Sequence, residues 1–138
     1  MTIIGITGTG SLFGQSIIKS IKKSSFKKSK LIGIDYFNDT VGSFWTDENF
    51  ILPDILDKNI KINQWLEKII SIIKSRKIRI LFVGIDFELP FFAQYKNIIK
   101  NEANCLIVVS DQNVINIGKD KYLTYKFLKE NGLNFPKT

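Results

Sequence analysis

Thr2-Ile-Ile-Gly-Ile-Thr-Gly-Thr-Gly-Ser-Leu-Phe-Gly14 is the stretch that decides the predicted fold. Its first six residues form a continuous apolar run, which is typical of a strand buried in a parallel sheet. The glycines that follow favour a tight turn. Beyond them, Phe13, Ile17 and Ile21 recur at helical spacing up to about Lys23. Strand, glycine loop and helix in this order predict the first unit of an α/β fold.

The rest of the chain repeats this alternation of strands and helices. Further strands are predicted at 31–35, 50–52, 78–83 and 105–109, and helices at about 58–75, from about 90 to 101, after Ser110 and from 120 to 131. Ser110 and Asp120 are expected to cap the last two helices, and Gly132 to end the final one. The predicted fold class is α/β, with a Rossmann-like three-layer parallel sheet of about five strands flanked by helices.

Composition excludes several classes of protein. With 138 residues the chain has the size of one domain, and no apolar run approaches the roughly 20 residues of a membrane span. The net charge of +7 includes six lysines between residues 19 and 30. Because helical spacing leaves these lysines facing solvent, no nucleic-acid partner is expected. The single cysteine, Cys105, is expected to be a small core residue in a reducing compartment, so a cytoplasmic location is predicted.

The candidate site follows from the carboxyl ends of the predicted strands, where ligands bind to open α/β sheets. Four pieces of sequence reach that edge: the loop at Gly8–Gly14, Asp35, the turn at Gly84–Glu88 and Ser110. The glycine spacing is one residue longer than the dinucleotide fingerprint, so the loop serves either an anion or only the turn. Asp35 could bind a ribose hydroxyl or cap a loop. Because the chain has no histidine, Ser-His and Cys-His catalysis and most zinc sites are excluded.

Several of these stretches, in this order, resemble the preATP-grasp domain of ATP-grasp enzymes, specifically those similar to the large subunit of carbamoyl-phosphate synthase. The similar stretches are Ile6–Ile18, Gly33–Asp35, Phe50–Pro53, Gly84–Leu89 and the closing Asp120-Lys…Phe127-Leu-Lys-Glu-Asn-Gly…Pro136-Lys-Thr138. In that family the closing stretch leads into the ATP-binding domain. The resemblance therefore implies a Rossmann-like preATP-grasp domain at 1–119, with the start of an ATP-grasp domain at 120–138.

The function implied by this resemblance is that of a ligase which acts through an acyl phosphate. ATP and Mg²⁺ would serve the complete enzyme, whereas no cofactor, metal ligand or catalytic residue is expected in this chain. The implied partners are a small carboxylate or carbamate-type substrate and an ATP-grasp domain, in cis or as a separate subunit. The resemblance also implies substrate contacts by two groups of residues: Gly8, Gly10, Ser11 and Gly14, and Asp86 and Glu88.

Two other interpretations remain open. The loop at Thr7–Gly14 is also similar to the cofactor loop of short-chain dehydrogenases and nucleotide-sugar epimerases, in which Asp35 would hold a ribose. Tyr122 and Lys126 match the Tyr-x-x-x-Lys pair of that family, and Ser110 stands where it places a serine. The third interpretation is a stand-alone module that binds a small anion or assembles with a separately encoded ATP-binding subunit, with its final helix as the docking element.

Overall fold

Five parallel strands form a single sheet. The computed structural model describes residues 1–136, and its strands are β1 (Ile3–Thr7), β2 (Lys30–Asp35), β3 (Glu48–Ile51), β4 (Ile80–Phe82) and β5 (Leu106–Val108). Their order across the sheet is β3-β2-β1-β4-β5, and every neighbouring pair is parallel. The predicted Rossmann-like architecture is therefore confirmed. The order reverses between β1 and β4, which marks the switch point of the sheet.

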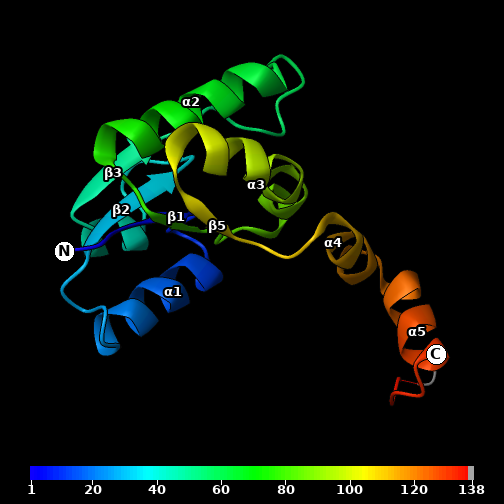
Figure 1. Ribbon diagram of the computed structural model, residues 1–138. Helices are drawn as coiled ribbons and strands as arrows, with labels where there is room; N and C mark the ends of the chain where they lie inside the picture. The colour runs from blue at the N-terminus through cyan, green and yellow to red at the C-terminus, as the bar shows by residue number, and fades with distance from the viewer. Residues whose placement is uncertain (137–138) are drawn as a thin grey trace.

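Helices cover the two faces of this sheet unequally. Figure 1 shows α2 and α3 on one face, α1 on the other, and α4 and α5 projecting from the body as an arm. The bounds are α1 (Leu12–Lys23), α2 (Ile62–Arg76), α3 (Leu89–Ala103), α4 (Gln112–Lys119) and α5 (Lys121–Glu130), with 3₁₀ turns η1 (Val41–Trp45) and η2 (Asp86–Glu88).

Two predicted helix starts are wrong. Helix α2 begins at Ile62 instead of about residue 58, because Asp57 accepts a hydrogen bond from the amide of Asn59 and holds the chain in a turn. Ser110 does not cap α4: the N-cap position belongs to Asp111, whose carboxylate pairs with Lys96. Asp120 caps α5 as predicted, accepting hydrogen bonds from two backbone amides.

The larger core lies between the sheet and helices α2 and α3. Trp65 of α2 is fully buried and meets Phe91 and Phe92 of α3 edge-on, at ring separations of 4.6 and 5.8 Å. Its indole N–H donates to the carbonyl of Pro53 at 3.0 Å, so the polar atom of this buried ring is satisfied. Cys105 lies in the same core, as predicted, and burial raises the pKa of its thiol to about 12.

The smaller core lies beneath α1 and does not include residues of β5. It joins Ile18 and Ile21 of α1 to Ile4, Ile6 and Leu31 of β1 and β2. Side chains alternate along a strand, so Leu106 and Val108 of β5 point away from the buried Ile107. Both are exposed, at 55% and 43%.

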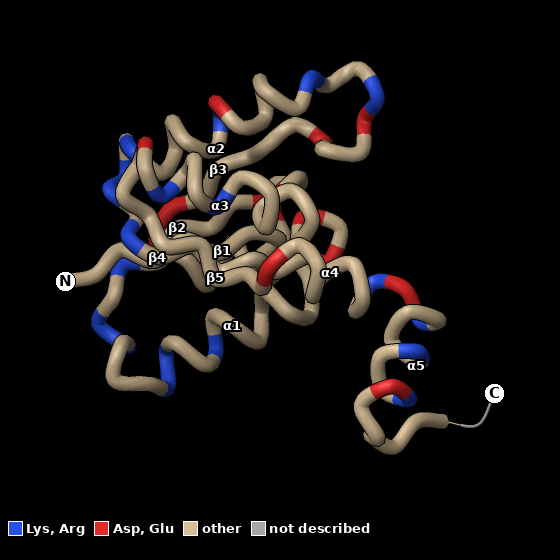
Figure 2. Tube along the Cα trace, turned by 45° about the vertical axis from the view of Figure 1, so that its right-hand side comes forward, with Lys and Arg blue, Asp and Glu red and all other residues tan. Residues whose placement is uncertain are grey.

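Most of the six lysines between residues 19 and 30 face solvent, as predicted. Figure 2 shows them spaced along α1 and the turn that follows it, on the outside of the fold. Lys30 and Arg76 both pair with Glu48, and Lys19 lies over the ring of Trp45 at 4.9 Å. Among residues 1–136, no helix is long and apolar enough to cross a membrane.

Candidate functional site

The glycine loop connects β1 to α1 beside the switch point of the sheet. Gly8 has a φ of +55°, a conformation that strongly favours glycine. Ser11 caps α1 by accepting a hydrogen bond from the amide of Gly14 at 2.9 Å, and its hydroxyl donates to the carbonyl of Gly84 at 2.6 Å. The loop is thereby tied across the switch point to the end of β4.

Asp35, at the end of β2, braces this loop from below. Its buried carboxylate accepts from the hydroxyl of Thr9 and the amides of Gly10 and Tyr36, each at 2.8 Å. A carboxylate with three hydrogen bonds inside the protein has little capacity left for a ribose hydroxyl. Of the two roles expected for Asp35, the geometry supports the structural one.

Two glycines allow the elements at the switch point to approach closely. A Cβ atom on Gly14 would lie 2.2 Å from the carbonyl oxygen of Gly8, and one on Gly84 would lie 2.2 Å from that of Thr7. On the other side, the side chain of Ile85 lies against Gly8. These glycines therefore serve close packing of backbone, whether or not the loop also meets a ligand.

Glu88 lies under the site, enclosed by protein. The side chain is 1% exposed and accepts hydrogen bonds from the hydroxyls of Thr7 and Tyr36, the latter at 2.6 Å. Burial raises the pKa of Glu88 to about 7, although the two hydroxyl donors oppose this shift. Through these bonds Glu88 joins the ends of β1 and β2 to the start of α3.

The six residues predicted to contact substrate fall into two groups. Gly8, Gly14 and Glu88 are buried, whereas Gly10, Ser11 and Asp86 are half-buried or exposed. Asp86 lies on the surface at the start of η2, where one carboxylate oxygen accepts from the amide of Phe87 at 2.9 Å. The structure thus gathers all six around the switch point, and their contact with substrate stays a prediction.

Two hollows open on either side of the glycine loop. The first, which we call the acidic cleft, has a volume of about 600 Å³. Four parts of the chain line it: the glycine loop (Gly10, Ser11), the end of β2 with the segment that follows (Asp35, Tyr36, Phe37, Asp39, Thr40, Val41), the segment after β3 (Asp54, Leu56), and η2 with the residue before it (Ile85, Phe87). The second, the apolar groove, measures about 560 Å³ and lies between α1 and the end of β4, with Leu89 and Phe26 among its lining residues.

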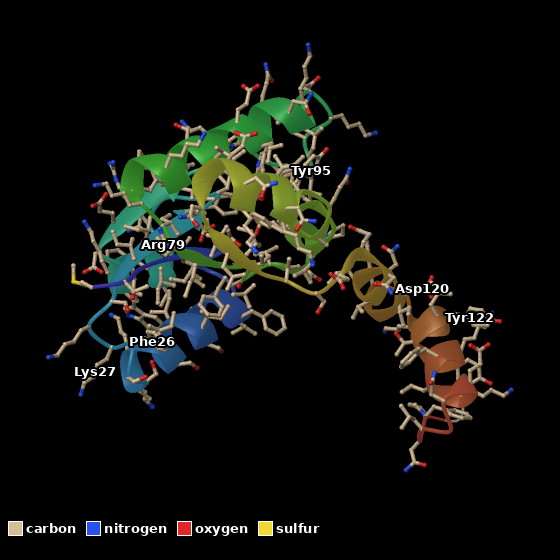
Figure 3. All side chains as sticks on the ribbon, viewed as in Figure 1. Phe26, Lys27, Arg79, Tyr95, Asp120 and Tyr122 are labelled. Carbon is tan, nitrogen blue, oxygen red and sulfur yellow. The ribbon has the colours of Figure 1, made fainter. Side chains whose placement is uncertain are left out.

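The Ser110, Tyr122 and Lys126 side chains, which matched the reactive residues of a dehydrogenase, are not brought to this site, although the glycine loop and Asp35 are. Figure 3 shows Tyr122 on the projecting arm, away from the glycine loop. Tyr122 is 70% exposed and lines neither hollow, and Lys126 pairs with Glu130 on the same helix at 3.8 Å. Ser110 is exposed after β5 and lines neither hollow.

The described residues lack two features that would favour a nucleotide with Mg²⁺ here: a group of metal ligands, and glycine amides without a hydrogen-bond partner. Within the described part of the chain, no group of three or more His, Cys, Asp or Glu residues could hold a metal ion. The amides of Gly8, Gly10, Ser11 and Gly14 already donate to protein acceptors. A phosphate would have to displace these bonds to use the loop as its cradle.

Sequence reasoning missed several residues that shape the acidic cleft. Tyr36, Asp39, Asp54 and Phe87 line it, and Thr7 supports it from below through Glu88. The sequence feature that could have identified them is their position shortly after predicted strands, or within the turn after β4, where ligands bind to open α/β sheets. Residue type alone did not distinguish them from ordinary loop residues.

Comparison with known proteins finds similarity of structure. The sequence matches no family model and no curated protein. N5-carboxyaminoimidazole ribonucleotide synthetase from Thermotoga maritima is similar over 99% of this chain and 32% of its own, with 20% identity and a TM-score of 0.64. L-amino acid ligase from Bacillus licheniformis gives the same coverage, 15% identity and a TM-score of 0.65.

Other solved structures share the fold to different extents. The biotin carboxylase domain of the Hydrogenobacter thermophilus 2-oxoglutarate carboxylase, solved with MgADP and bicarbonate, is similar over 94% of this chain and 27% of its own, with 13% identity and a TM-score of 0.61. A dTDP-glucose 4,6-dehydratase from Bacillus anthracis in complex with NAD is similar over 78% of this chain, with 12% identity and a TM-score of 0.50.

These similarities support the predicted relationship at the level of the fold. The synthetase, the L-amino acid ligase and the biotin carboxylase domain are ATP-grasp enzymes, and this chain spans 27–32% of their length. The narrower resemblance to carbamoyl-phosphate synthase stays a prediction. What the chain shares with these neighbours is the Rossmann-like fold of a preATP-grasp domain.

Proposed function

We propose that this chain is the substrate-side, preATP-grasp domain of an ATP-dependent ligase that joins a carboxylate or carbamate-type group to an amine. The observation that carries the proposal is the extent of the structural similarity. Two ATP-grasp ligases of different specificity align with 99% of the chain, whereas the NAD-dependent dehydratase aligns with 78%. The ligase alignment therefore includes nearly all of the projecting arm as well as the sheet.

The chemistry of such a ligase explains why this domain needs few reactive groups. A carboxylate is activated as an acyl phosphate, which an amine then attacks. Stabilising the charge on the transferring phosphoryl group is the task of a metal ion and of cationic side chains. In this proposal those groups belong to the ATP-binding domain, since no group of metal ligands is found among residues 1–136.

In this proposal the residues of the switch point divide into two roles. Gly10, Ser11 and Asp86 lie where a substrate held between this domain and the ATP-binding domain would touch them. Asp35 and Glu88 hold the loop and the strand ends in position by buried hydrogen bonds. The domain would thus orient the substrate and exclude water from one side of the active site.

An assay of ATP turnover tests the proposal. The complete polypeptide encoded by the gene of this chain is incubated with ATP, Mg²⁺ and panels of carboxylates and amines, and ADP release is measured. We expect ADP release that requires both a carboxylate-type substrate, bicarbonate included, and an amine. Absence of substrate-dependent ADP release across the panels, or turnover of NAD(P)H instead, would contradict the proposal.

The predicted contact of Asp86 is tested in the same assay. Asp86→Ala is expected to raise the KM of one substrate about 10-fold, as for loss of one charged hydrogen bond. The matched control is Asp57→Ala, an exposed acid outside the lining of both hollows. An unchanged substrate KM in Asp86→Ala removes Asp86 from the site.

A further inference from the structure

The acidic cleft has a lining that is unusual for this chain. The protein has 20 lysine and arginine residues and a net charge of +7, yet neither type is among the described residues that line the cleft. Three aspartates line it instead: Asp35, Asp39 and Asp54. The charge of this cleft is therefore opposite in sign to that of the molecule as a whole.

Two of these aspartates have unused acceptor capacity. Asp54 accepts one hydrogen bond, from the amide of Leu56 at 2.8 Å, with one of its two carboxylate oxygens. For Asp39, no hydrogen bond or ion pair is found within residues 1–136. The third, Asp35, already accepts three hydrogen bonds, two from the glycine loop and one from the amide of Tyr36. Asp39 and Asp54 are thus free to accept hydrogen bonds from a ligand.

Aromatic and aliphatic side chains form the remaining walls. The rings of Tyr36 and Phe87 pack at a tilt of 42°, with a centroid separation of 5.7 Å. Phe37, Val41 and Leu56 line the cleft while remaining largely exposed. An apolar concave surface with few polar groups is typical of a small-molecule site. Aromatic faces beside carboxylates form the environment that recognises an ammonium group.

The glycine loop offers this cleft no receptor for an anion. The amide of Gly10 donates to Asp35, and that of Ser11 donates to the carbonyl of Gly8 at 2.9 Å. An anionic substrate group in the cleft would therefore meet carboxylates without compensating donors from the loop. Negative charges that lie close together repel one another, so the aspartates disfavour a carboxylate or phosphate in the cleft.

We infer that the acidic cleft binds the ammonium group of an amine, with Asp39 and Asp54 as its partners. The apolar body of that amine lies against Phe37, Leu56 and Phe87. That the ligand is the amine substrate of a ligase rests on the proposed function; the binding chemistry of the cleft does not. The inference separates the two substrates in space, because the carboxylate-type substrate must then bind outside this cleft.

Binding to the 138-residue chain alone tests the inference. The probes are phenethylamine, 2-phenylethanol and phenylacetate, which have closely similar shapes and carry a positive, no and a negative charge. Their effects on the backbone amide resonances of the cleft are followed by NMR. We expect phenethylamine to shift the resonances of Phe37, Asp39, Asp54 and Phe87, with a Kd in roughly the millimolar range usual for a fragment of this size. The alcohol should bind more weakly, and the acid most weakly.

Charge-neutral variants assign the effect to the two carboxylates. Asp39→Asn and Asp54→Asn are each expected to weaken phenethylamine about 5- to 10-fold and to leave 2-phenylethanol nearly unchanged. The control is Asp57→Asn, which removes an exposed acid from the same segment as Asp54 without touching the cleft. It should bind all three probes like the unmodified chain.

Each outcome decides for or against the inference. Preference for phenylacetate, equal binding of all three probes, or no shifts in the cleft up to the solubility of phenethylamine would overturn it. Equal effects of Asp57→Asn and Asp54→Asn would also overturn it, because the attraction would then be unspecific. Since these measurements use neither ATP nor turnover, their failure leaves the ligase proposal to its own assay, and a failed ligase assay leaves the amine site to these titrations.

Discussion

Glu88 is an acidic residue whose side chain is buried in the protein. The carboxyl group is enclosed beneath the glycine loop, with the hydroxyls of Thr7 and Tyr36 as its hydrogen-bond donors. No lysine or arginine pairs with Glu88 among the described residues. Its ionisation therefore takes place inside the protein without an opposite charge, which is why burial dominates the rise of its pKa to about 7.

This environment predicts a decline in stability between pH 5 and pH 8. The folded protein holds the Glu88 proton up to a pKa of about 7, whereas the unfolded chain releases it near the ordinary value of 4.5. The folded state binds more protons in this window, so the free energy of unfolding falls as pH rises, by about 2–3 kcal/mol. Urea unfolding across this pH range measures the effect, and Glu88→Gln should abolish it.

Because the sequence has no histidine, a change in stability across this pH range can be assigned to Glu88. Histidine is the side chain whose ordinary pKa lies between pH 5 and pH 8. Asp86→Asn, two residues away on the surface, serves as the control and should retain the decline. A Glu88→Gln variant with an undiminished pH dependence would show that the carboxyl group titrates elsewhere.

Two glycines provide a matched pair for a second prediction. A methyl group on Gly14 would meet the Gly8 carbonyl oxygen at 2.2 Å and other backbone atoms within 3 Å, whereas Gly118 in α4 has nothing within 4 Å. Gly14→Ala should therefore destabilise the fold by at least about 2 kcal/mol. Gly118→Ala should stabilise it by roughly 0.5–1 kcal/mol, since alanine favours a helix. Chemical unfolding of both variants tests the close approach of α1 to the loop.

At the scale of elements, the helices differ in how much they depend on the sheet. Helices α2 and α3 bury aromatic and aliphatic side chains against it, whereas α4 and α5 contain no buried residue. Helix α5 packs mainly on α4, and the side chain of Asp111 at the start of α4 pairs with Lys96 of α3. Helix α4 also packs on α3, so α5 is the helix of the arm expected to contribute least to the stability of the α/β body.

Two phenylalanines, each within a helix, test this difference. Phe92 in α3 is fully buried, whereas Phe127 in α5 is 43% exposed. Phe92→Ala should lower the free energy of unfolding by about 3–5 kcal/mol through loss of contacts and formation of a cavity. Phe127→Ala should lower it by less than about 1 kcal/mol. Similar losses in both variants would show that the arm packs on the body in solution.

For the whole molecule, the features of the switch point argue against nucleotide binding by this chain alone. The four amides of Gly8, Gly10, Ser11 and Gly14 already donate to protein acceptors. Asp35 is buried, and Tyr122 lies on the arm, away from the loop. Calorimetric titration of the 138-residue chain with NAD⁺, NADP⁺ and MgATP should show no binding with a Kd below about 100 μM, equivalent to roughly −5.5 kcal/mol. Micromolar binding of NAD(P) would instead favour the dehydrogenase interpretation.

Local sequence determined the kind of fold. Continuous apolar runs such as Ile3–Thr7, followed by helical periodicity such as that of Ile17 and Ile21, predict a parallel α/β sheet because both patterns reflect burial of one chain segment at a time. The glycines at 8, 10 and 14 marked the loop beside the switch point, because a tight turn also depends on residues that are close together in the sequence. Helix starts were less predictable, since the turn at Asp57 and the pairing of Asp111 with Lys96 compete with the helix pattern.

Only the tertiary structure decided what the polar residues do. Glu88 and Asp86 have the same chemistry and neighbouring positions, yet one is buried under Thr7, which is 81 residues distant in sequence, and the other lies on the surface. Asp35 accepts hydrogen bonds from the glycine loop, whereas Asp39 and Asp54, from two different segments, line the acidic cleft. Such assignments depend on contacts between segments far apart in the chain, and no local pattern encodes them.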